Sequence, residues 1–354
     1  MEILLEEFYQ QELHVEKFHP RKCFIYQNSY QIIGISQSGK THLVKNYLLS
    51  HKKNSYLYID CSDIRIELIL FNTLLPSFCL KNKIDILVFD NYTEKFTIPN
   101  VTQLLLTSEK PYKVSHLEIL QLYPLDYEEF LAYQHKYDSS ALNHFFQLGG
   151  LPSMHRIYQE TKHIYIQKIL KMTLSEIEFE ILKLCAKFVS QKISPYMLYE
   201  RLKQVRKISK DKLYLSFQSL KEKNYIHLLE KFNHKQAIKR LYLCDISIKT
   251  SLDIEKNFAK LFENMVFLEL LKSNTQCFYA DDIDFYIPQK NEIILCKPFA
   301  DERRLFKKLE ALEAFLVTHS ILHVSVITMN KEGSIAHPLA KVAIIPFDIW
   351  ALGD

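Results

Sequence analysis

Eight consecutive residues near the N-terminus form the most specific chemical pattern in the chain. Residues 34–41 read Gly-Ile-Ser-Gln-Ser-Gly-Lys-Thr and match the phosphate-binding pattern G-x-x-x-x-G-K-[ST] at every fixed position. The backbone N–H groups of such a loop point at phosphate oxygens, and the N-terminus of the next helix adds positive potential. The pattern predicts that ATP binds through Gly34, Ile35, Ser36, Gln37, Ser38, Gly39, Lys40 and Thr41.

The last two residues of the loop have separate roles in this chemistry. The Lys40 ammonium would reach the β- and γ-phosphates, and the Thr41 hydroxyl would bind Mg²⁺. An apolar run at 30–33 precedes the loop and a helix-like run at 43–48 follows it, as the pattern requires. The alternative is a strand–turn–helix connection with an incidental lysine. Because only 6 glycines occur in the chain, a chance match is on the order of one in a thousand.

A second candidate site residue ends the hydrophobic run 84–90, which reads IDILVFD. A carboxylate at the end of such a strand, here Asp90, is the Walker B pattern and would hold Mg²⁺ through water opposite Thr41. The alternative is an ordinary polar end of a buried strand. Most ATPases of this type continue with a glutamate, but here Asn91 follows and cannot act as a base, while Glu94 lies one helical turn further on. We assign the catalytic positions to Asp90, Asn91 and Glu94 and expect hydrolysis to be slow or absent.

Residues 101–107 predict another buried strand, which ends in Thr107. A polar residue at the end of the strand beside Walker B is where a sensor of the γ-phosphate would lie, so we include Thr107 in the nucleotide site. An ordinary Thr-Ser cap after a strand explains the same residues.

These residues need a scaffold of strands that end at one edge of a sheet. Runs at 55–60 and 117–122 predict two more strands, and 124–133 predicts a helix with Asp126 as its cap. Alternating strands and helices of this kind indicate an α/β fold, a parallel sheet with helices on both faces.

Composition limits the class of protein. The 354 residues, 48% of them hydrophobic, allow two or three globular domains. A formal net charge of +4 gives no whole-molecule argument for nucleic acid. Seven scattered cysteines suit a reducing compartment better than disulfides or a zinc site. The N-terminus does not resemble a signal peptide, and no apolar run is long enough to span a membrane, so we expect a cytoplasmic protein.

The middle of the chain predicts a winged helix. Helical periodicity at 176–188, 195–205 and 210–223 is followed by strand-like runs at 225–231 and 241–244. Ser194 is the expected cap of the second helix, which starts with proline. Phosphate contacts with DNA would come from Lys207, Lys210, Lys212, Lys221, Lys223, Lys231, Lys235, Lys239 and Arg240. Docking of a protein partner is the alternative.

The C-terminal part predicts an αβββαβ pattern. The run 258–272 has helical periodicity and contains Glu263, and the strands that follow contain Asp284 and end at Lys297. A helix at 303–317 and a strand at 322–328 complete the pattern.

The chain resembles a family of bacterial and archaeal P-loop ATPases of the AAA+ class with a restriction-endonuclease-like C-terminal domain. The matching segments are Pro20-Arg21, GISQSGKT, the VFD strand, LLLTSE, LYPLDYEEFL and GGLPSMHR. The resemblance implies an ATP-binding domain with a helical lid at 1–160, a winged helix at 161–245 and an endonuclease-like domain at 246–354. It also implies that Arg156 faces the nucleotide, although an ordinary surface charge explains this arginine as well.

In the endonuclease-like fold a helix Glu, a strand Asp and a Glu-x-Lys surround a metal ion. By resemblance Glu263, Asp284 and Lys297 match three of these positions, and Leu295 replaces the Glu of Glu-x-Lys. We therefore expect a degenerate scaffold rather than a nuclease. The function we expect is a slow ATPase that acts as a nucleotide-dependent switch. A DNA- or protein-binding regulator that holds ATP as a structural ligand is the alternative, and the oligomeric state stays open.

Overall fold

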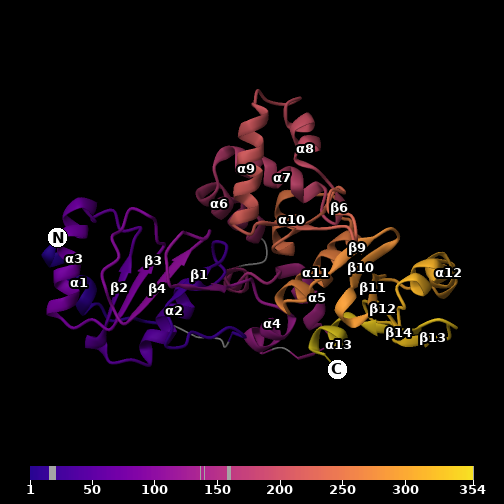
Figure 1. The fold of residues 1–354 in the computed structure, drawn as a ribbon, viewed down its shortest axis with the longest axis horizontal. Coiled ribbons are helices and arrows are strands. Elements are labelled where there is room, and N and C mark those ends of the chain that lie inside the picture. The colour runs from indigo at the N-terminus through magenta and orange to yellow at the C-terminus, as the bar shows by residue number, and fades with distance from the viewer. Residues whose placement is uncertain (16–20, 136, 139, 158–160, 354) are drawn as a thin grey trace. The chain divides into compact units, whose positions relative to one another are not determined.

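The computed structural model describes residues 1–15, 21–135, 137–138, 140–157 and 161–353, which form two compact units (Figure 1). Unit 1 comprises Met1–Pro124 and Glu222–Asn224, and unit 2 comprises Leu125–Lys221 and Tyr225–Asp354. Pro20, at the start of the first matching segment, lies outside the described residues.

Unit 1 is built on a parallel sheet with the strand order β2-β3-β4-β1-β5. The strands are β1 (Tyr30–Ile33), β2 (Tyr56–Asp60), β3 (Ile86–Asp90), β4 (Gln103–Ser108) and β5 (Glu118–Gln121). Strands β1 to β4 are buried along nearly their whole length, as expected for a sheet that is covered on both faces. Each strand starts and ends within two residues of the expected run, and the expected mixed α/β class is confirmed.

The helices of unit 1 pack against opposite faces of this sheet. They are α1 (Glu2–Gln10), α2 (Lys40–Leu49) and α3 (Leu68–Lys81). Leu87 and Phe89 of β3 lie in the hydrophobic cluster with α1 and α3. Ile86 and Val88 lie in the cluster with α2. By this alternation Asp90 points to the same face of the sheet as Ile86 and Val88, the face that α2 covers.

Unit 2 begins with α4 (Tyr127–Gln134) and α5 (Ala141–Leu148). The Asp126 side chain accepts a hydrogen bond from Glu129 N, and the Glu129 side chain accepts one from Asp126 N, so the expected cap is confirmed as a capping box. Both helices share a hydrophobic cluster with residues near the C-terminus, including Phe262 and Phe347. Their core therefore belongs to unit 2, while the expected division into three domains near residues 160 and 245 stays a prediction.

The middle of unit 2 contains the elements expected of a winged helix. The helices are α6 (Lys162–Thr173), α7 (Glu176–Lys187), α8 (Pro195–Leu202), α9 (Lys210–Glu222) and α10 (Ile246–Leu252). An antiparallel sheet of order β6-β8-β7 accompanies them, formed by β6 (Gln191–Lys192), β7 (Ile226–Leu229) and β8 (Arg240–Leu243). Ser194 caps α8 by accepting a hydrogen bond from Met197 N, as expected.

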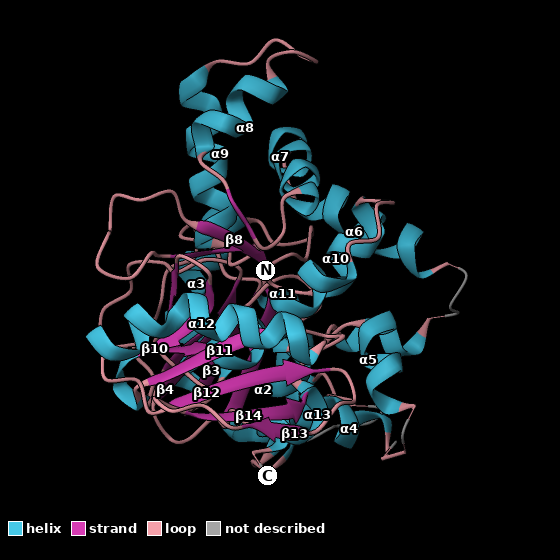
Figure 2. Cartoon of the chain, turned by 90° about the vertical axis from the view of Figure 1, so that its right-hand side faces the viewer, coloured by secondary structure: helices cyan, strands magenta, loops and turns pink. Residues whose placement is uncertain are grey.

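The C-terminal part of unit 2 has a mixed six-stranded sheet of order β13-β14-β12-β11-β10-β9. Its elements are α11 (Phe258–Lys272), β9 (Phe278–Ala280), β10 (Ile283–Ile287), β11 (Glu292–Cys296), α12 (Glu302–Thr318), β12 (His323–Thr328), β13 (Gly333–Ile335), β14 (Lys341–Pro346) and α13 (Phe347–Leu352). The expected αβββαβ order is present, and β13, β14 and α13 extend it. Figure 2 shows α12 lying across the strands of this sheet.

None of the helices in the described ranges has both the length and the apolar composition needed to cross a bilayer.

Candidate functional site

The phosphate-binding loop connects the carboxyl end of β1 to α2. A side chain on Gly34 would bring its Cβ to 2.4 Å from the backbone oxygen of Leu122, which is shorter than any real contact. Gly39 precedes α2 with φ 99°, in the region that favours glycine. The two glycines of the pattern are therefore required by a close approach and by a left-handed turn. Arg21 holds the outside of the loop, since its guanidinium donates to Ser38 O at 3.0 Å and to Tyr123 O at 2.6 Å.

Lys40 lies inside the loop. Its side chain is buried, and Nζ donates to Gly34 O at 2.7 Å and to Ile35 O at 3.0 Å. Burial lowers the pKa of Lys40, and the carboxylates of Glu109 and Asp90 act in the opposite direction. The ammonium is thus surrounded by oxygen atoms of the loop, in the position where the pattern places a phosphate-binding cation.

Thr41 and Asp90, separated by 49 residues in the sequence, meet in the structure. Thr41 Oγ1 donates to Asp90 Oδ2 at 2.7 Å, and the Asp90 side chain is almost fully buried. The hydroxyl and the carboxylate are oxygen groups of the kind that Mg²⁺ prefers, and their contact would let Thr41 bind the metal directly while Asp90 holds it through a bound water.

Two more hydroxyl groups donate to the Asp90 carboxylate. Thr107 Oγ1 donates to Oδ1, which brings the expected sensor residue to Walker B, and Tyr58 OH donates to Oδ2 at 2.6 Å. Burial, followed by the charge of Asp90, raises the pKa of Tyr58 far above its ordinary value, so the phenol stays protonated. Tyr58 was not expected from the sequence. Its position two residues before the end of β2 is the only local signal that it faces the same side as Asp60.

Of the two residues after Asp90 that we expected in the catalytic site, the structure places Asn91 there but not Glu94. Asn91 adopts φ 58°, its backbone N donates to Thr107 Oγ1 at 2.9 Å, and its side-chain amide donates to Asp60 Oδ1 at 3.1 Å. Glu94 lies exposed in the following turn and makes no hydrogen bond or ion pair with any described residue. The Glu94 charge contributes, after burial, to the raised pKa of Tyr92 and of Tyr112. The structure therefore brings Asn91 to Asp90 but does not bring Glu94 there.

The GGLPSMHR segment lies in unit 2, where Asp245 organises it. Gly150 N donates to Asp245 Oδ2 at 2.6 Å, and a side chain on Gly149 would collide with the same carboxylate. Arg156 is exposed, and its Nε donates to Tyr133 OH at 3.2 Å. The pair of glycines is explained by this close approach, and a nucleotide-facing role for Arg156 stays a prediction.

The carboxylates expected from the endonuclease-like fold lie together around an arginine. Arg240 NH1 is 3.2 Å from Glu263 Oε1 and 3.6 Å from Asp284 Oδ1. Tyr242 OH donates to Glu263 Oε1 at 2.7 Å, and Lys297 Nζ is 3.4 Å from Asp284 Oδ2. Burial, followed by the charge of Asp284, raises the pKa of Glu263 to about 7. Across the described ranges, no three His, Cys, Asp or Glu side chains come together as a metal site.

Leu295 does not occupy the place of a missing ligand. It packs with Leu305 and Leu309 in the cluster under α12, whereas Cys296 lies in the cluster on the α11 side, where Glu263 is. Alternation along β11 turns the Leu295 side chain to the other face of the sheet. The expectation that Leu295 stands where a ligand should be was therefore wrong.

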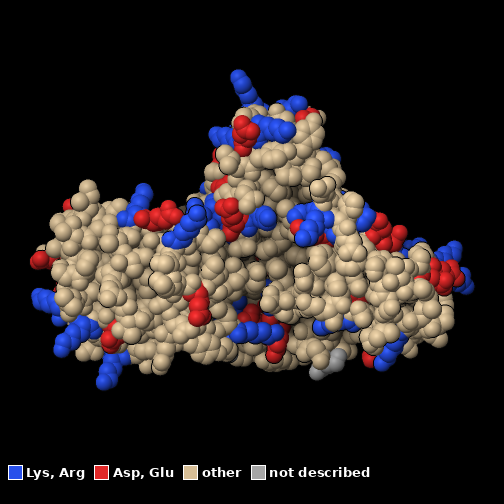
Figure 3. Space-filling view, viewed as in Figure 1, with Lys and Arg blue, Asp and Glu red and all other residues tan. Residues whose placement is uncertain are grey.

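The basic residues expected to contact DNA divide into two groups. In the strand region, Lys231 pairs with Asp281, Lys239 with Glu230, and Arg240 with the buried carboxylates. On α9 and just before it, exposed lysines lie at the end of unit 2 where α8 and α9 are (Figure 3), namely Lys207, Lys210, Lys212 and Lys221. Lys235 is exposed between β7 and β8, and Lys223 is half-buried. Lys210 Nζ also lies over the rings of Tyr196 and Tyr214, at 5.5 and 5.6 Å from their centroids. The basic surface is therefore smaller than expected and centred on α9.

Comparison with known proteins gives little that bears on function. No protein-family model matches the chain. An uncharacterized protein of Methanocaldococcus jannaschii is 24% identical over an alignment of 386 positions, which covers 91% of this chain and 87% of that protein. The solved structure of the Aeropyrum pernix Orc1 protein in complex with DNA is similar with a TM-score of 0.30 and 10% identity. That match covers 64% of this chain and 86% of that chain. A likeness at that score supports no argument about this chain.

Proposed function

We propose that this protein is an ATP-binding protein of the AAA+ class, a slow Mg²⁺-dependent ATPase whose nucleotide state acts as a switch. The contact between Thr41 Oγ1 and Asp90 Oδ2 carries the proposal, because it joins the last residue of the phosphate-binding loop to the carboxylate that ends β3. A strand–turn–helix connection with an incidental lysine has no reason to place a buried carboxylate against that threonine. The nucleotide site lies within unit 1.

Each residue of the site has a role that follows from its position. The loop N–H groups and the Lys40 ammonium bind the phosphates. In this structure Lys40 Nζ donates to Gly34 O and Ile35 O, and phosphate oxygens would replace these carbonyls as acceptors. Thr41 and Asp90 would hold Mg²⁺, which would supply positive charge to the phosphate oxygens when bound. The Thr107 hydroxyl links Asp90 to the backbone of Asn91, so a shift of one is transmitted to the other. This link supports a switch, because binding of a nucleotide and metal beside Asp90 would shift the segment that follows β3.

The test is calorimetry of ATP binding with Mg²⁺ and with EDTA. Lys40→Ala is expected to abolish measurable binding, because it removes the only side-chain cation in the loop. Asp90→Ala is expected to remove the part of the affinity that depends on Mg²⁺. Lys52→Ala is the control, since Lys52 is an exposed lysine of the same unit outside the loop. Equal affinity in wild type and Lys40→Ala would refute the assignment.

A second candidate function is binding of DNA through α9. The exposed lysines at this helix, with Lys210 beside the Tyr196 and Tyr214 rings, offer cations for the phosphates of DNA. If they bind DNA, the affinity falls steeply with salt concentration and depends little on base sequence. Anisotropy of a labelled duplex, titrated at several salt concentrations, measures this slope. The triple change Lys207→Ala, Lys210→Ala and Lys212→Ala is expected to reduce the slope by roughly 0.9 for each phosphate that the protein no longer neutralises.

The control for that measurement is Lys231→Ala, because Lys231 is already paired with Asp281 at 2.6 Å. Absence of binding at low salt would favour a protein partner for this surface. We propose no nuclease activity for unit 2, since Arg240 lies between the two carboxylates that a metal would need.

A further inference from the structure

Asp60 ends β2, the strand next to β3, and lies opposite Asp90 in the register of the two strands. Its carboxylate reaches across to the Asn91 amide, with 3.1 Å between Oδ1 and Nδ2. An acid and an amide therefore form a pair at adjacent strand ends, and the acid of this pair comes from β2.

The backbone at Asn91 favours asparagine over the glutamate that usually follows this aspartate. Asn91 has φ 58°, in the left-handed region, where asparagine and aspartate are enriched several-fold over other residues with a Cβ. The asparagine fits this turn and turns its amide toward Asp60.

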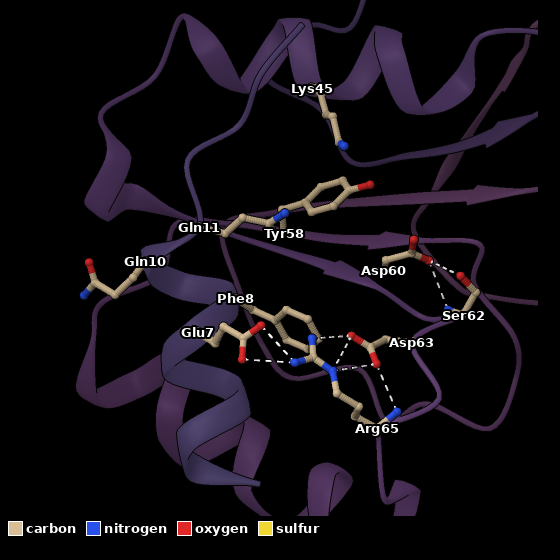
Figure 4. A pocket seen from close by; sticks show the side chains of 10 residues that line it. All are labelled: Glu7, Phe8, Gln10, Gln11, Lys45, Tyr58, Asp60, Ser62, Asp63 and Arg65. Carbon is tan, nitrogen blue, oxygen red and sulfur yellow. Dashed lines mark hydrogen bonds and ion pairs between the residues drawn. The ribbon is translucent and has the colours of Figure 1, made fainter.

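The hydrogen bonds of Asp60 leave one of its oxygens available. Ser62 N at 3.0 Å, Ser62 Oγ at 2.7 Å and the Asn91 amide all donate to Oδ1. Oδ2 accepts no hydrogen bond from the part of the chain that the structure describes. Asp60 and Tyr58 line a pocket of about 560 Å³ together with residues of α1, Lys45 of α2 and the segment after β2, and Figure 4 shows both side chains in it; residues 34–41 and Asp90 are not among those that line it. Water thus reaches a carboxylate whose other oxygen is held in place.

We propose that Asp60 is the general base of ATP hydrolysis, with Asn91 as its positioning residue; this rests on the proposed ATPase function. Asp60 Oδ2 takes one proton from a water molecule as the water oxygen bonds to the γ-phosphorus. The bond from that phosphorus to the β–γ bridging oxygen breaks, and ADP leaves with the electron pair. The other water proton stays on the phosphate, and protonated Asp60 returns its proton to solvent.

The competing interpretation is that Asp60 only stabilises the turn that it starts, in which Asp63 N donates to Asp60 O and Ser62 donates to the Asp60 side chain. A structural role of that kind predicts a lower melting temperature in Asp60→Asn but unchanged turnover per folded molecule. The experiment therefore measures phosphate release at saturating ATP, ATP affinity by calorimetry and thermal stability on the same full-length preparations.

Asp60→Asn is expected to reduce kcat by about 100-fold or more, the usual contribution of a general base, with ATP affinity within about twofold of wild type. The exchange Asp60→Asn/Asn91→Asp keeps an acid–amide pair and moves the acid to β3, where φ 58° tolerates aspartate. It is expected to regain at least about tenfold of the lost kcat. Asp63→Asn is the matched control, since Asp63 lines the same pocket and pairs with Arg65 instead of Asn91.

A kcat of Asp60→Asn within about threefold of that of the wild type would overturn the proposal that Asp60 is the base, but would not contradict the proposed ATP-binding function. Loss of turnover in Glu94→Gln but not in Asp60→Asn would assign the base to Glu94 instead. A wild type that binds ATP and Mg²⁺ without turnover would also overturn it. Failure of the wild type to bind ATP would refute the proposed function itself, which calorimetry detects independently of turnover.

Discussion

Replacing Arg240 by alanine is expected to destabilise unit 2 by a large and pH-dependent amount. The side chains of Arg240, Glu263 and Asp284 are 14%, 14% and 15% exposed. Removing the arginine leaves two carboxylates in that setting without their shared cation. Breaking a buried pair in this way typically costs about 3–5 kcal/mol. Because Lys297 stays 3.4 Å from Asp284 and is more exposed, we expect the lower end of that range.

The pH dependence follows from the direction of the Glu263 pKa shift. Burial and the Asp284 charge raise its pKa from 4.5 to about 7, and Arg240 acts in the opposite direction. A carboxyl whose pKa is higher in the folded state contributes stability below its unfolded pKa and loses that contribution as pH rises through the folded pKa. Without Arg240 the Glu263 pKa rises further. The loss of stability in Arg240→Ala should therefore be larger at pH 8 than at pH 5.5, where Glu263 is mostly protonated.

The assay is chemical unfolding followed by the fluorescence of Trp350, the only tryptophan, which lies in α13 of unit 2. Arg303→Ala, an exposed arginine of α12, is the control. The pair Arg240→Met/Glu263→Gln should recover most of the stability, because it removes the cation together with one of its carboxylates. A loss below about 1 kcal/mol at pH 8, or the same loss at both pH values, would refute this account of the cluster.

Three other outcomes follow from the same structure. Gly34→Ala places a Cβ 2.4 Å from Leu122 O, so the loop must shift, and calorimetry should show ATP affinity reduced by about tenfold or more. Tyr58→Phe removes one donor to Asp90, and amide hydrogen exchange should show unit 1 less stable by about 1.5–3 kcal/mol. Leu295→Glu places a carboxylate in the core under α12, so unit 2 should unfold in the Trp350 assay, and neither this variant nor wild type should cleave supercoiled plasmid with Mg²⁺ or Mn²⁺.

The sequence determined the features whose information lies within a few residues. The phosphate-binding loop, the strand that ends in Asp90 and the helix cap at Asp126 were all predicted, and each was found at the expected position. A turn needs a glycine at a particular place, and a helix start needs an oxygen next to its free N–H groups. Such requirements are local, so residue type and spacing are enough to reveal them.

The tertiary structure decided which distant residues meet. Tyr58 and Asp60 reach Asp90 and Asn91 only because β2 is the neighbour of β3, in a register that pairs Asp60 with Asp90. Neither the strand order nor the register can be inferred from one strand alone, since a shift by one residue would turn every side chain to the other face.

The same reason accounts for the two errors of the sequence interpretation in unit 2. Arg240 was assigned to an exposed basic surface, but packing of β8 against α11 brings it to Glu263, and to Asp284 of β10 beside it. Leu295 was placed at a site that its strand turns away from. In both cases the sequence gives the residue type but not the face of the sheet to which the side chain points. That face depends on which elements pack against each side of the sheet.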